Sequence, residues 1–555
     1  MDLRVAVANL IWFLHSSIRA KKWRRGSKNV EATQNDVLRH LISENAETEF
    51  GREHSSKTID STEAFQKAVP IRTYEDFLPY IDAIAEGTPE VLTKEPVSHF
   101  GVSSGSVSAS KLIPYTSSLI SDFQEGIDPW MYHLMKDHPR ILGGKTYWSV
   151  TPVGENKKFS PGGIPIGFDD ERSYFGRLTQ WVMESVMVAP SELALIQNMD
   201  VFKYATLRFL LQEKSLSWIS VWNPSFLTLL LSPLQKWFDI LIEDIRTGSL
   251  SVDLGVTPEA DVNIRRALKR LPKRAEELSL IQKERDDDLY EKIWPNLNLI
   301  SCWAHGNSED AVRHLRKYFP NTSIQPKGLI ATEAFVSFPF QREASALSIN
   351  SHFFEFEEVG SGTIKLAHQL ETGKKYSLII TTSGGLYRYR LYDIIEVLEF
   401  ENECPLIRFV GKQDKTVDIC GEKLNEEFVS STIKEIIARH SIQLSFWMVA
   451  PLRNEDDVHY VFFVQYEKGY FPCEEEMVAI NEDIDSSFRE NFHYDYCRRL
   501  GQLGRGKIFL VETSCDAFQT YLTTCQELGQ RLGDIKPVAL HSYQFWSKKF
   551  RGRFI

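Results

Sequence analysis

The chain has 555 residues, of which 43% are hydrophobic and 25% are charged, as in ordinary globular proteins. This length exceeds what one hydrophobic core usually serves, so we expect two domains. The net charge of −11 disfavours binding to nucleic acid, and we expect no nucleic-acid partner. The seven cysteines are scattered without a C-x-x-C pair, which disfavours a zinc cluster or a disulfide framework and fits a reducing cytoplasm.

An apolar run near the N-terminus is followed by a basic cluster. Val5–Leu14 is apolar over ten residues, about half of what a membrane-spanning helix needs, so we expect no stable membrane insertion. The basic residues that follow are Arg19, Lys21, Lys22, Arg24 and Arg25. Such a segment fits either a helix on a membrane surface or a first helix docked on the core, and we expect the docked helix.

Helices and apolar strands alternate up to about residue 412. The predicted helices include 30–45, 61–69 and a charged stretch at 257–290, and the predicted strands are 147–153, 219–222, 297–303, 328–331, 353–357, 377–382, 394–400 and 407–410. Further along, we predict strands at 416–420, 446–449, 460–465 and 507–511, and helices that begin at 424 and span 478–488. This pattern predicts the α/β class, with a large mixed α/β domain at 1–412 and a small α+β domain at 413–555.

The segment Ser103–Thr116, SSGSVSASKLIPYT, is rich in serine and glycine and contains a lysine. Small residues let a backbone approach a ligand closely, and hydroxyl and backbone N–H groups in such a turn can bind an anion. Lys111 would add a positive charge for a nucleotide phosphate. The spacing is not that of a Walker P-loop, and a solvated serine-rich loop remains the alternative.

The same segment overlaps a second pattern. Gly101–Gly105 fits G-x-S-x-G, the nucleophile elbow of α/β-hydrolases, which needs a helix directly after the serine. The residues that follow are poor helix formers, and no HGGG-type segment precedes them. We therefore disfavour a hydrolase.

Two acidic residues, Glu333 and Asp393, suit a nucleotide and its metal ion. Thr332 and Glu333 follow a predicted strand, and a carboxylate at a strand end can hold Mg²⁺ through one bond while the ion keeps several waters. Such a pair is also found where a strand simply ends at solvent. Asp393 closes TTSGGLYRYRLYD, and one carboxylate can accept hydrogen bonds from two sugar hydroxyls.

Taken in order, these stretches and FVGKQDKTVDICGEKL at 409–424 resemble the auxin-responsive Gretchen Hagen family of acyl acid amido synthetases, within the adenylate-forming ligases. The resemblance covers about residues 30–545, and a non-plant branch is the closer likeness. Its other motifs are FGREH at 50–54, VPIRTYEDFLPYI at 69–81, SVWNPSFL at 220–227, SHFFEF at 351–356 and RLGDIKP at 531–537. Each motif is weak alone, but their shared order is hard to obtain by chance.

The resemblance implies a fold and an activity. The fold would be a large N-terminal adenylation domain with a small, mobile C-terminal domain. The enzyme would use ATP and Mg²⁺ to activate a small carboxylic acid as an acyl-adenylate, and would pass the acyl group to an amine, usually of an amino acid. We expect a cytoplasmic monomer. A thioester-forming ligase and a catalytically silent homologue that acts as a binding protein are the alternatives.

The resemblance also implies roles for particular residues. The phosphate loop would hold Ser103, Ser104, Gly105, Ser106 and Lys111, and the other contacts would be Thr332 and Glu333 for nucleotide and Mg²⁺, Phe354 beside adenine, Asp393 at the ribose, Lys412 in the hinge and Lys536 as a lysine that swings over the site. Of these, Lys111, Glu333 and Lys536 would be catalytic. Trp222 and helices near 117–135 and 173–188 would wall the acid pocket.

This sequence departs from the family pattern at several positions. The phosphate loop is one residue shorter than usual, with Val107 in place of a hydroxyl residue, and Ser108 or Ala109 replaces a glycine. Ala334 and Tyr392 also stand where glycine is usual. Glycine is often selected for a positive φ, so these changes predict either a retuned or a degraded nucleotide site.

Overall fold

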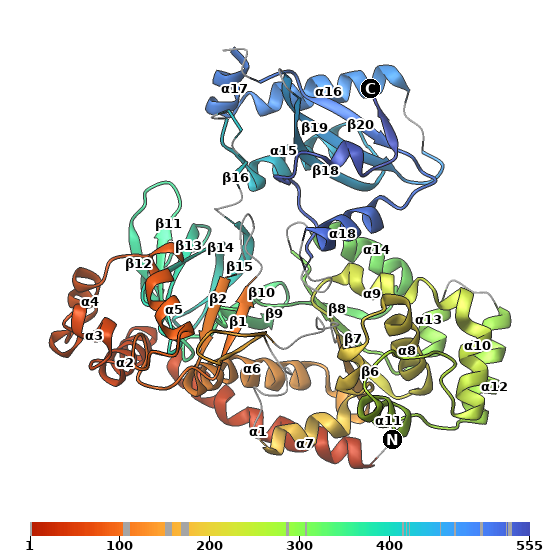
Figure 1. The fold of residues 1–555 in the computed structure, drawn as a ribbon, viewed down its shortest axis with the longest axis horizontal. Coiled ribbons are helices and arrows are strands. Elements are labelled where there is room, and N and C mark those ends of the chain that lie inside the picture. Colours follow the sequence, from red (N-terminus) through yellow and green to blue (C-terminus); the bar gives the residue numbers. More distant parts are fainter. Residues whose placement is uncertain are drawn as a thin grey trace. The chain divides into compact units, whose positions relative to one another are not determined.

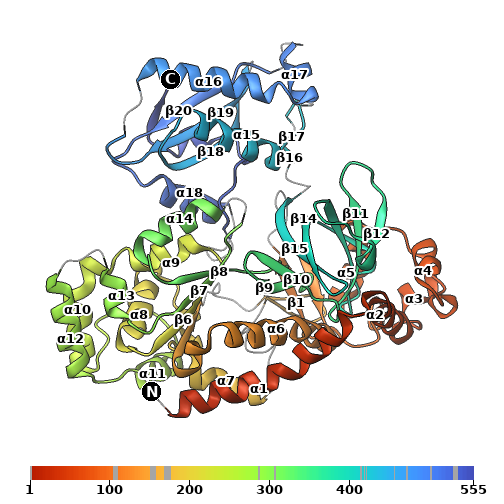
Figure 2. The same ribbon diagram turned by 180° about the vertical axis from the view of Figure 1, so that it is seen from behind.

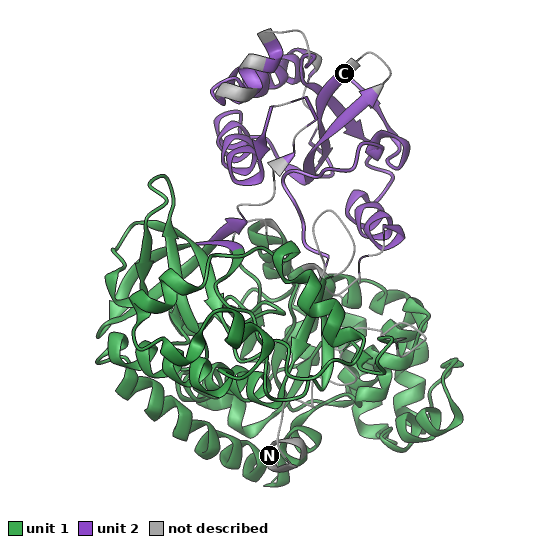
Figure 3. Ribbon diagram, turned by 60° about the vertical axis from the view of Figure 1, so that its left-hand side comes forward, with its two compact units in different colours: residues 1–103, 110–391, 395–409 green, residues 104–109, 392–394, 410–555 purple. Residues whose placement is uncertain are grey.

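The computed structural model describes residues 3–103, 111–149, 158–167, 177–284, 288–305, 308–412, 416–417, 419–420, 422–454, 457–470, 473–499, 503–528, 530 and 535–555. The chain forms two compact units (Figure 3). Unit 1 comprises residues 1–103, 110–391 and 395–409, and unit 2 comprises residues 104–109, 392–394 and 410–555.

Unit 1 begins with helices whose ends follow from the sequence (Figure 1). They are α1 (Leu3–Gly26), α2 (Val30–Glu44), α3 (Glu49–Glu53), α4 (Thr62–Ala68), α5 (Leu78–Ala85) and α6 (Ser117–Asp137). Polar side chains cap α2, α3, α4 and α6. In α4 the Ser61 hydroxyl accepts a hydrogen bond from the Ala64 N–H at 3.2 Å, which confirms the helix predicted at 61–69. The helix predicted at 30–45 is confirmed by α2, which buries Leu38 and Leu41.

Two largely antiparallel sheets follow the first helices in unit 1. The first has the strand order β2-β1-β5-β4, and the second has the order β12-β11-β13-β14-β15-β10-β9. The strands are β1 (His99–Ser103), β2 (Lys111–Tyr115), β4 (Lys158–Phe159), β5 (Pro165–Ile166), β9 (Ser337–Gln341), β10 (Ala344–Leu347), β11 (Phe353–Glu358), β12 (Ile364–Leu366), β13 (Lys375–Thr381), β14 (Tyr389–Glu401) and β15 (Cys404–Lys412). The strands predicted at 353–357, 377–382, 394–400 and 407–410 are confirmed.

A third sheet in unit 1 is parallel, in the order β3-β6-β7-β8. Its strands are β3 (Lys145–Trp148), β6 (Leu216–Ser220), β7 (Leu299–Cys302) and β8 (Ser323–Pro326). Every residue of β6 and β7 is buried, as expected for parallel strands covered on both faces. The covering helices are α7 (Arg177–Val186), α8 (Met199–Gln212), α9 (Pro224–Leu231), α10 (Leu234–Thr247), α11 (Pro258–Arg266), α12 (Pro272–Glu284), α13 (Leu289–Ile293) and α14 (Glu309–Tyr318).

The strand predicted at 328–331 is wrong. Only Ile330 forms a bridge there, with Phe335, and β8 already ends at Pro326. Gly328 packs so closely on the chain that an added Cβ would lie 2.0 Å from the Ser337 carbonyl oxygen. The Leu329 carbonyl accepts hydrogen bonds from both the Val336 and Ser337 N–H groups, so the segment folds back on itself instead of extending.

Unit 2 has its own hydrophobic core and a mixed sheet in the order β18-β19-β20-β21. Its elements are β16 (Thr416–Val417), β17 (Leu424–Asn425), α15 (Glu426–Arg439), β18 (Leu444–Asn454), β19 (Asp457–Tyr466), α16 (Glu474–Phe488), α17 (Phe492–Arg499), β20 (Lys507–Val511), α18 (Ala517–Glu527) and β21 (Gly552–Phe554). The helix predicted to begin at 424 begins at Glu426, because Asn425 caps it by accepting from the Glu427 N–H at 2.8 Å.

Helix α1 docks on unit 1, as the sequence predicted, and runs beside α6 in both ribbon views (Figures 1 and 2). Its buried face carries Val5, Ala8, Trp12, Ala20 and Trp23. Within the described ranges, no helix combines the length and the apolar character needed to cross a membrane.

A buried ion pair joins the N-terminal helices to the large sheet of unit 1. The Arg388 guanidinium donates to both carboxylate oxygens of Glu355 at 2.8 Å, and also to the backbone carbonyls of Gln66 and Val69. Both side chains are almost fully buried, at 7% and 1% exposure. Removal of one partner would leave the other charge buried without compensation.

We therefore predict that Glu355→Ala lowers the free energy of unfolding by about 3–5 kcal/mol, the usual cost of breaking a buried pair. Equilibrium denaturation measures this loss. The matched control is Asp36→Ala, which removes the exposed ion pair with Arg39 and should leave stability almost unchanged. Equal, small effects of both substitutions would contradict a structural role for the buried pair.

Candidate active site

Lys111 lies at the start of β2, between two tyrosines. Strands β1 and β2 pair antiparallel, and Ser103 stands opposite Lys111 in their register. The Lys111 ammonium is 3.4 Å from the Tyr389 hydroxyl and 5.3 Å from the centre of the Tyr74 ring. Tyr74 is fixed in turn, because its hydroxyl accepts the Leu112 N–H at 2.7 Å. The cation therefore has a defined position at this edge of the sheet.

The other predicted phosphate-loop residues, Ser104, Gly105 and Ser106, lie outside the described residues, as do Val107, Ser108 and Ala109. The hydrolase alternative does not fit the hairpin that β1 and β2 form. A nucleophile elbow places its serine between a strand and a helix. Ser103 ends β1, and the next described element is β2, which pairs back onto β1.

Thr332 and Glu333 occupy the tip of a tight turn rather than the end of a strand. The Ala331 N–H donates to the Ala334 carbonyl at 3.0 Å and closes the turn. The Tyr115 hydroxyl, at the far end of β2, donates to the Thr332 carbonyl at 2.6 Å. The turn is therefore attached to the strand that carries Lys111.

The Glu333 carboxylate is only 6% exposed. It also acts on Tyr74, whose pKa is raised mainly by burial and in part by the negative charges of Asp82 and Glu333. Tyr74 therefore has the Lys111 ammonium over its ring, and the charge of Glu333, which is far away in the sequence, also acts on it.

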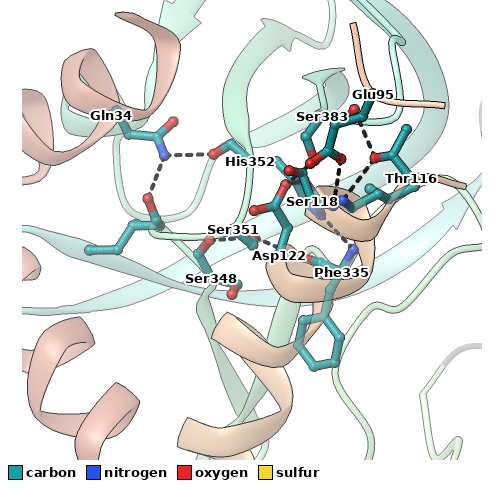
Figure 4. A network of polar contacts seen from close by, with 12 residues as sticks. Gln34, Glu95, Thr116, Ser118, Asp122, Phe335, Ser348, Ser351, His352 and Ser383 are labelled. Atoms are coloured by element: carbon teal, nitrogen blue, oxygen red, sulfur yellow. Dashed lines mark hydrogen bonds and ion pairs between the residues drawn. The ribbon is translucent and has the colours of Figure 1, made fainter. Parts of the chain in front are cut away.

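Two residues of the SHFFEF stretch hold the end of this turn (Figure 4). The Phe335 N–H donates to His352 Nε2 at 3.0 Å, and the Ser351 hydroxyl donates to the Phe335 carbonyl at 3.0 Å. Burial lowers the pKa of His352 to about 3, so its ring is neutral and Nε2 can accept. On the other side, Gly126 of α6 meets the Phe335 ring, where an added Cβ would lie 2.0 Å from a ring carbon.

A second group of polar residues lies beside the hydrogen bonds that hold Phe335 (Figure 4). The Ser383 hydroxyl donates to the Asp122 carboxylate, and the Thr116 hydroxyl donates to the Ser383 carbonyl at 3.2 Å. Asp122 Oδ2 is 3.9 Å from His352 Nδ1. Burial raises the pKa of Asp122 to about 8. Neither Asp122 nor His352 was expected from the sequence to be a functional residue. The signals nearby were the motifs SHFFEF, which contains His352, and TTSGG, which contains Ser383.

The position of Phe354 does not match its expected role as an adenine contact. Its side chain has no exposed surface, and it packs in the core between the rings of His352 and Phe356, whose centres are 6.0 and 6.5 Å away. A ring without an exposed face cannot stack on a ligand. In this structure Phe354 supports the sheet from within.

Trp222, expected in the wall of the acid pocket, lies beside a buried lysine. The Lys327 ammonium is 4.6 Å from the centre of the Trp222 ring and 4.7 Å from the centre of the Trp130 ring, and it donates to the Ser220 hydroxyl at 2.7 Å. Trp130 belongs to α6, as the predicted wall at 117–135 requires. The second wall, at 173–188, includes α7, and its first residues lie outside the described ranges.

Unit 2 contains Asp393, Lys412 and Lys536. The Lys412 ammonium is 3.5 Å from Asp393 Oδ2, and Asp393 is only 2% exposed. Its neighbour Tyr392 has a φ of +64°, a conformation that costs a side chain of this size about 1–2 kcal/mol. This angle explains why glycine suits the position. Ala334, the other replaced glycine, keeps a negative φ and carries no such cost.

Lys536 has an exposed side chain on an anchored backbone. The Tyr521 hydroxyl donates to the Lys536 carbonyl at 2.7 Å, and the preceding Ile535 is fully buried. The lysine is thus fixed at its backbone and extended toward solvent.

The donor set fits a magnesium nucleotide. Among the described residues, no cluster of three or more histidine, cysteine or acidic side chains could hold a metal ion alone. Mg²⁺ in nucleotide sites is usually bound through one or two carboxylates, with phosphates and waters completing its shell. A single buried carboxylate, Glu333, suits that mode, and Lys111 would supply a cation for phosphate.

Asp122 should make stability depend on pH. Its pKa is about 8 when folded against 3.8 in the ordinary state, so the folded chain keeps a proton that the unfolded chain releases. Stability should therefore fall as pH rises from about 4 to about 8. Asp122→Asn removes the free-energy cost of keeping this proton bound at high pH. We predict that the substitution raises the free energy of unfolding by on the order of a few kcal/mol at pH 7 and leaves it unchanged near pH 4.

Thermal unfolding at several pH values measures this gain. The exposed Asp60→Asn serves as the matched control and should follow the wild-type profile. A constant difference between Asp122→Asn and wild type at every pH would mean that Asp122 is ionised when folded.

Three sequence models of one family match this chain in order: the GH3 family N-terminal domain at residues 19–324, its central domain at 345–412 and its C-terminal domain at 426–542. The probable indole-3-acetic acid-amido synthetase GH3.4 of Oryza sativa subsp. japonica is 25% identical, over 84% of this chain and 80% of its own. The probable indole-3-acetic acid-amido synthetase GH3.1 of Arabidopsis thaliana is 24% identical, over 74% of this chain and 71% of its own.

A solved structure has the same fold. The AtGH3.15 acyl acid amido synthetase in complex with 2,4-DB superposes with a TM-score of 0.82 at 22% identity, and the match covers 96% of this chain and 95% of the other. The helices, sheets and two units described above are therefore those of an acyl acid amido synthetase fold. With family domains matched along most of its length, the chain belongs to the GH3 family.

Proposed function

We propose that this chain is an ATP-dependent acyl amide synthetase, which activates a carboxylic acid as an acyl-adenylate and transfers the acyl group to an amine of an amino acid. The observation that carries the proposal is the ordered match of all three GH3 domains. Lys111 against the Tyr74 ring, and the nearly buried Glu333 on a turn attached to the same strand, support it, because a magnesium nucleotide site needs a cation and a carboxylate.

The first half-reaction brings like charges together. A carboxylate oxygen of the acid attacks the α-phosphorus of ATP, the new O–P bond forms, and pyrophosphate leaves. Lys111 and Lys536 would neutralise negative charge that builds up on the phosphate oxygens. Mg²⁺, held through Glu333, would supply further positive charge at the phosphates. Asp393 would accept hydrogen bonds from the ribose hydroxyls, with Thr332 beside the nucleotide.

The second half-reaction forms the amide. The amine nitrogen attacks the acyl carbon, the C–N bond forms, AMP leaves, and the nitrogen loses a proton. An acyl-adenylate reacts readily with water, so the site must be closed while it exists. We assign the closing role to a mobile C-terminal domain, residues 413–555, that moves against residues 1–412 about a hinge at Lys412. The acid would lie near Trp222 and Trp130, and the enzyme would act as a cytoplasmic monomer.

Acid-dependent exchange of pyrophosphate into ATP tests the proposal. We expect exchange only when a suitable acid is present, in a panel that includes indole-3-acetic acid because the relatives are named for it. Addition of amino acids should then give an amide, detected by mass spectrometry. Product formation with coenzyme A in place of an amino acid would identify a thioester-forming ligase. Absence of exchange with every acid would identify a silent homologue.

Substitutions at Asp393 and Lys536 should affect different steps. Asp393→Ala should weaken ATP binding, since each hydrogen bond to a charged acceptor contributes about 1.5–3 kcal/mol. Lys536→Ala should slow adenylate formation by about 10²-fold, the scale of one lost electrostatic contact in a transition state, and leave ATP binding nearly unchanged. Amide formation from a supplied acyl-adenylate should survive in the Lys536 variant.

Lys468→Ala is the control for Lys536, because Lys468 is another exposed lysine of unit 2. Normal adenylation by Lys536→Ala would transfer the role to another cation, in the first place Lys111. Unchanged ATP affinity in Asp393→Ala would remove that residue from the site.

A further inference from the structure

Helix α1 has a second apolar face that unit 1 does not cover. Its exposed apolar residues recur every three or four positions, and are Leu3 at 74% exposure, Val7 at 43%, Leu10 at 50%, Leu14 at 57% and Ile18 at 66%. This spacing places them on one side of a helix. We call these residues the α1 stripe. Helix α1 is thus apolar on two faces, one packed and one open.

The charged side chains of α1 are all basic. The helix, Leu3–Gly26, contains no acidic residue. Its exposed cations are Arg4, Lys21, Lys22, Arg24 and Arg25. Arg19, which is half-buried, pairs with Glu125 and Asp128 of α6 at 3.2 and 2.7 Å, and Lys22 also pairs with Glu125, at 3.0 Å. The chain as a whole carries a net charge of −11, so this positive region is local.

Exposed apolar side chains beside cations, without acids, match the chemistry of a lipid surface. Amphipathic helices at membrane surfaces bury an apolar face at the boundary between headgroups and acyl chains, and place lysine and arginine against anionic headgroups. A second copy of this chain is a poorer match, because a symmetric contact would bring two cationic helices together without an acid on either.

The sequence match to the GH3 N-terminal domain does not include the stripe, because it begins at residue 19, beyond Ile18. Trp12 and Trp23, on the buried side of α1, already anchor the helix to unit 1. The stripe residues keep 43% to 74% of their surface exposed, so the described part of unit 1 covers them only in part.

We propose that α1 attaches the protein to anionic membrane surfaces. The helix would lie in the plane of the interface, with the α1 stripe among the upper acyl chains and Lys21 and Arg25 against lipid phosphates. Because the opposite face of α1 stays packed on unit 1, attachment needs no unfolding. This inference is independent of the reaction proposed above.

Co-sedimentation of the full-length protein with vesicles tests the proposal. We expect binding to phosphatidylcholine vesicles that contain phosphatidylserine, weaker binding to pure phosphatidylcholine, and a decrease with added salt. The double variant Leu10→Ser/Leu14→Ser should bind at least about tenfold more weakly, since it loses two buried apolar side chains. Lys21→Glu/Arg25→Glu should lose about fivefold or more for each charge, and only on the anionic vesicles.

Leu280→Ser is the matched control, because Leu280 is equally apolar and 63% exposed on α12. It should bind like the wild type. Circular dichroism and thermal unfolding should show that the α1 variants stay folded, as their changed side chains are exposed. Failure of the wild type to bind anionic vesicles, or equal binding by Leu10→Ser/Leu14→Ser, would overturn the proposal. So would a wild-type dimer that these substitutions convert to a monomer without any lipid binding.

Discussion

The candidate site depends on one constraint: a nearly buried carboxylate must be held at the tip of a short turn. Glu333 is 6% exposed, and its turn is closed by backbone hydrogen bonds from Ala331 to the Ala334 carbonyl and from Val336 and Ser337 to the Leu329 carbonyl. The rest of the support comes from elsewhere in the chain. His352 accepts a hydrogen bond from the Phe335 N–H, and Ser351 donates one to the Phe335 carbonyl. Tyr115 donates one to the Thr332 carbonyl. Because these partners come from separate elements, the turn can be placed only when the domain is assembled.

The same logic applies to the strained segment that leads to Asp393. Arg388 and Tyr392 both have positive φ, at +50° and +64°, which bulky residues adopt only where surrounding contacts hold them. Arg388 is held by the Glu355 carboxylate and by two backbone carbonyls. Breaking these hydrogen bonds of Arg388 would be strongly destabilising, so they can offset the local backbone strain. Strained backbone of this kind clusters at binding sites, which supports the role proposed for Asp393.

The proposed chemistry divides between the two units. Of the residues assigned to this chemistry, Lys111 and Glu333 belong to unit 1, and Asp393, Lys412 and Lys536 belong to unit 2. A reaction that joins two anions needs positive charge at the phosphate, and an activated acyl group must be kept from water. The α1 stripe adds a separate property: it would place unit 1 on a lipid surface without taking part in catalysis.

The sequence alone determined the family, the class of fold and a number of the helices and strands, because ordered motifs and apolar periodicity are local signals that survive without a structure. Residues 30–44, 62–68 and 507–511 form the predicted elements for that reason. Only the tertiary structure decided the rest. Residues 328–331 were predicted to form a strand, but hydrogen bonds to residues 334–337 fold them back. Phe354 was expected to contact a ligand, but neighbouring strands bury it. The raised pKa of Asp122 and the open face of α1 depend on what packs against a side chain, and spacing along a chain does not contain that information.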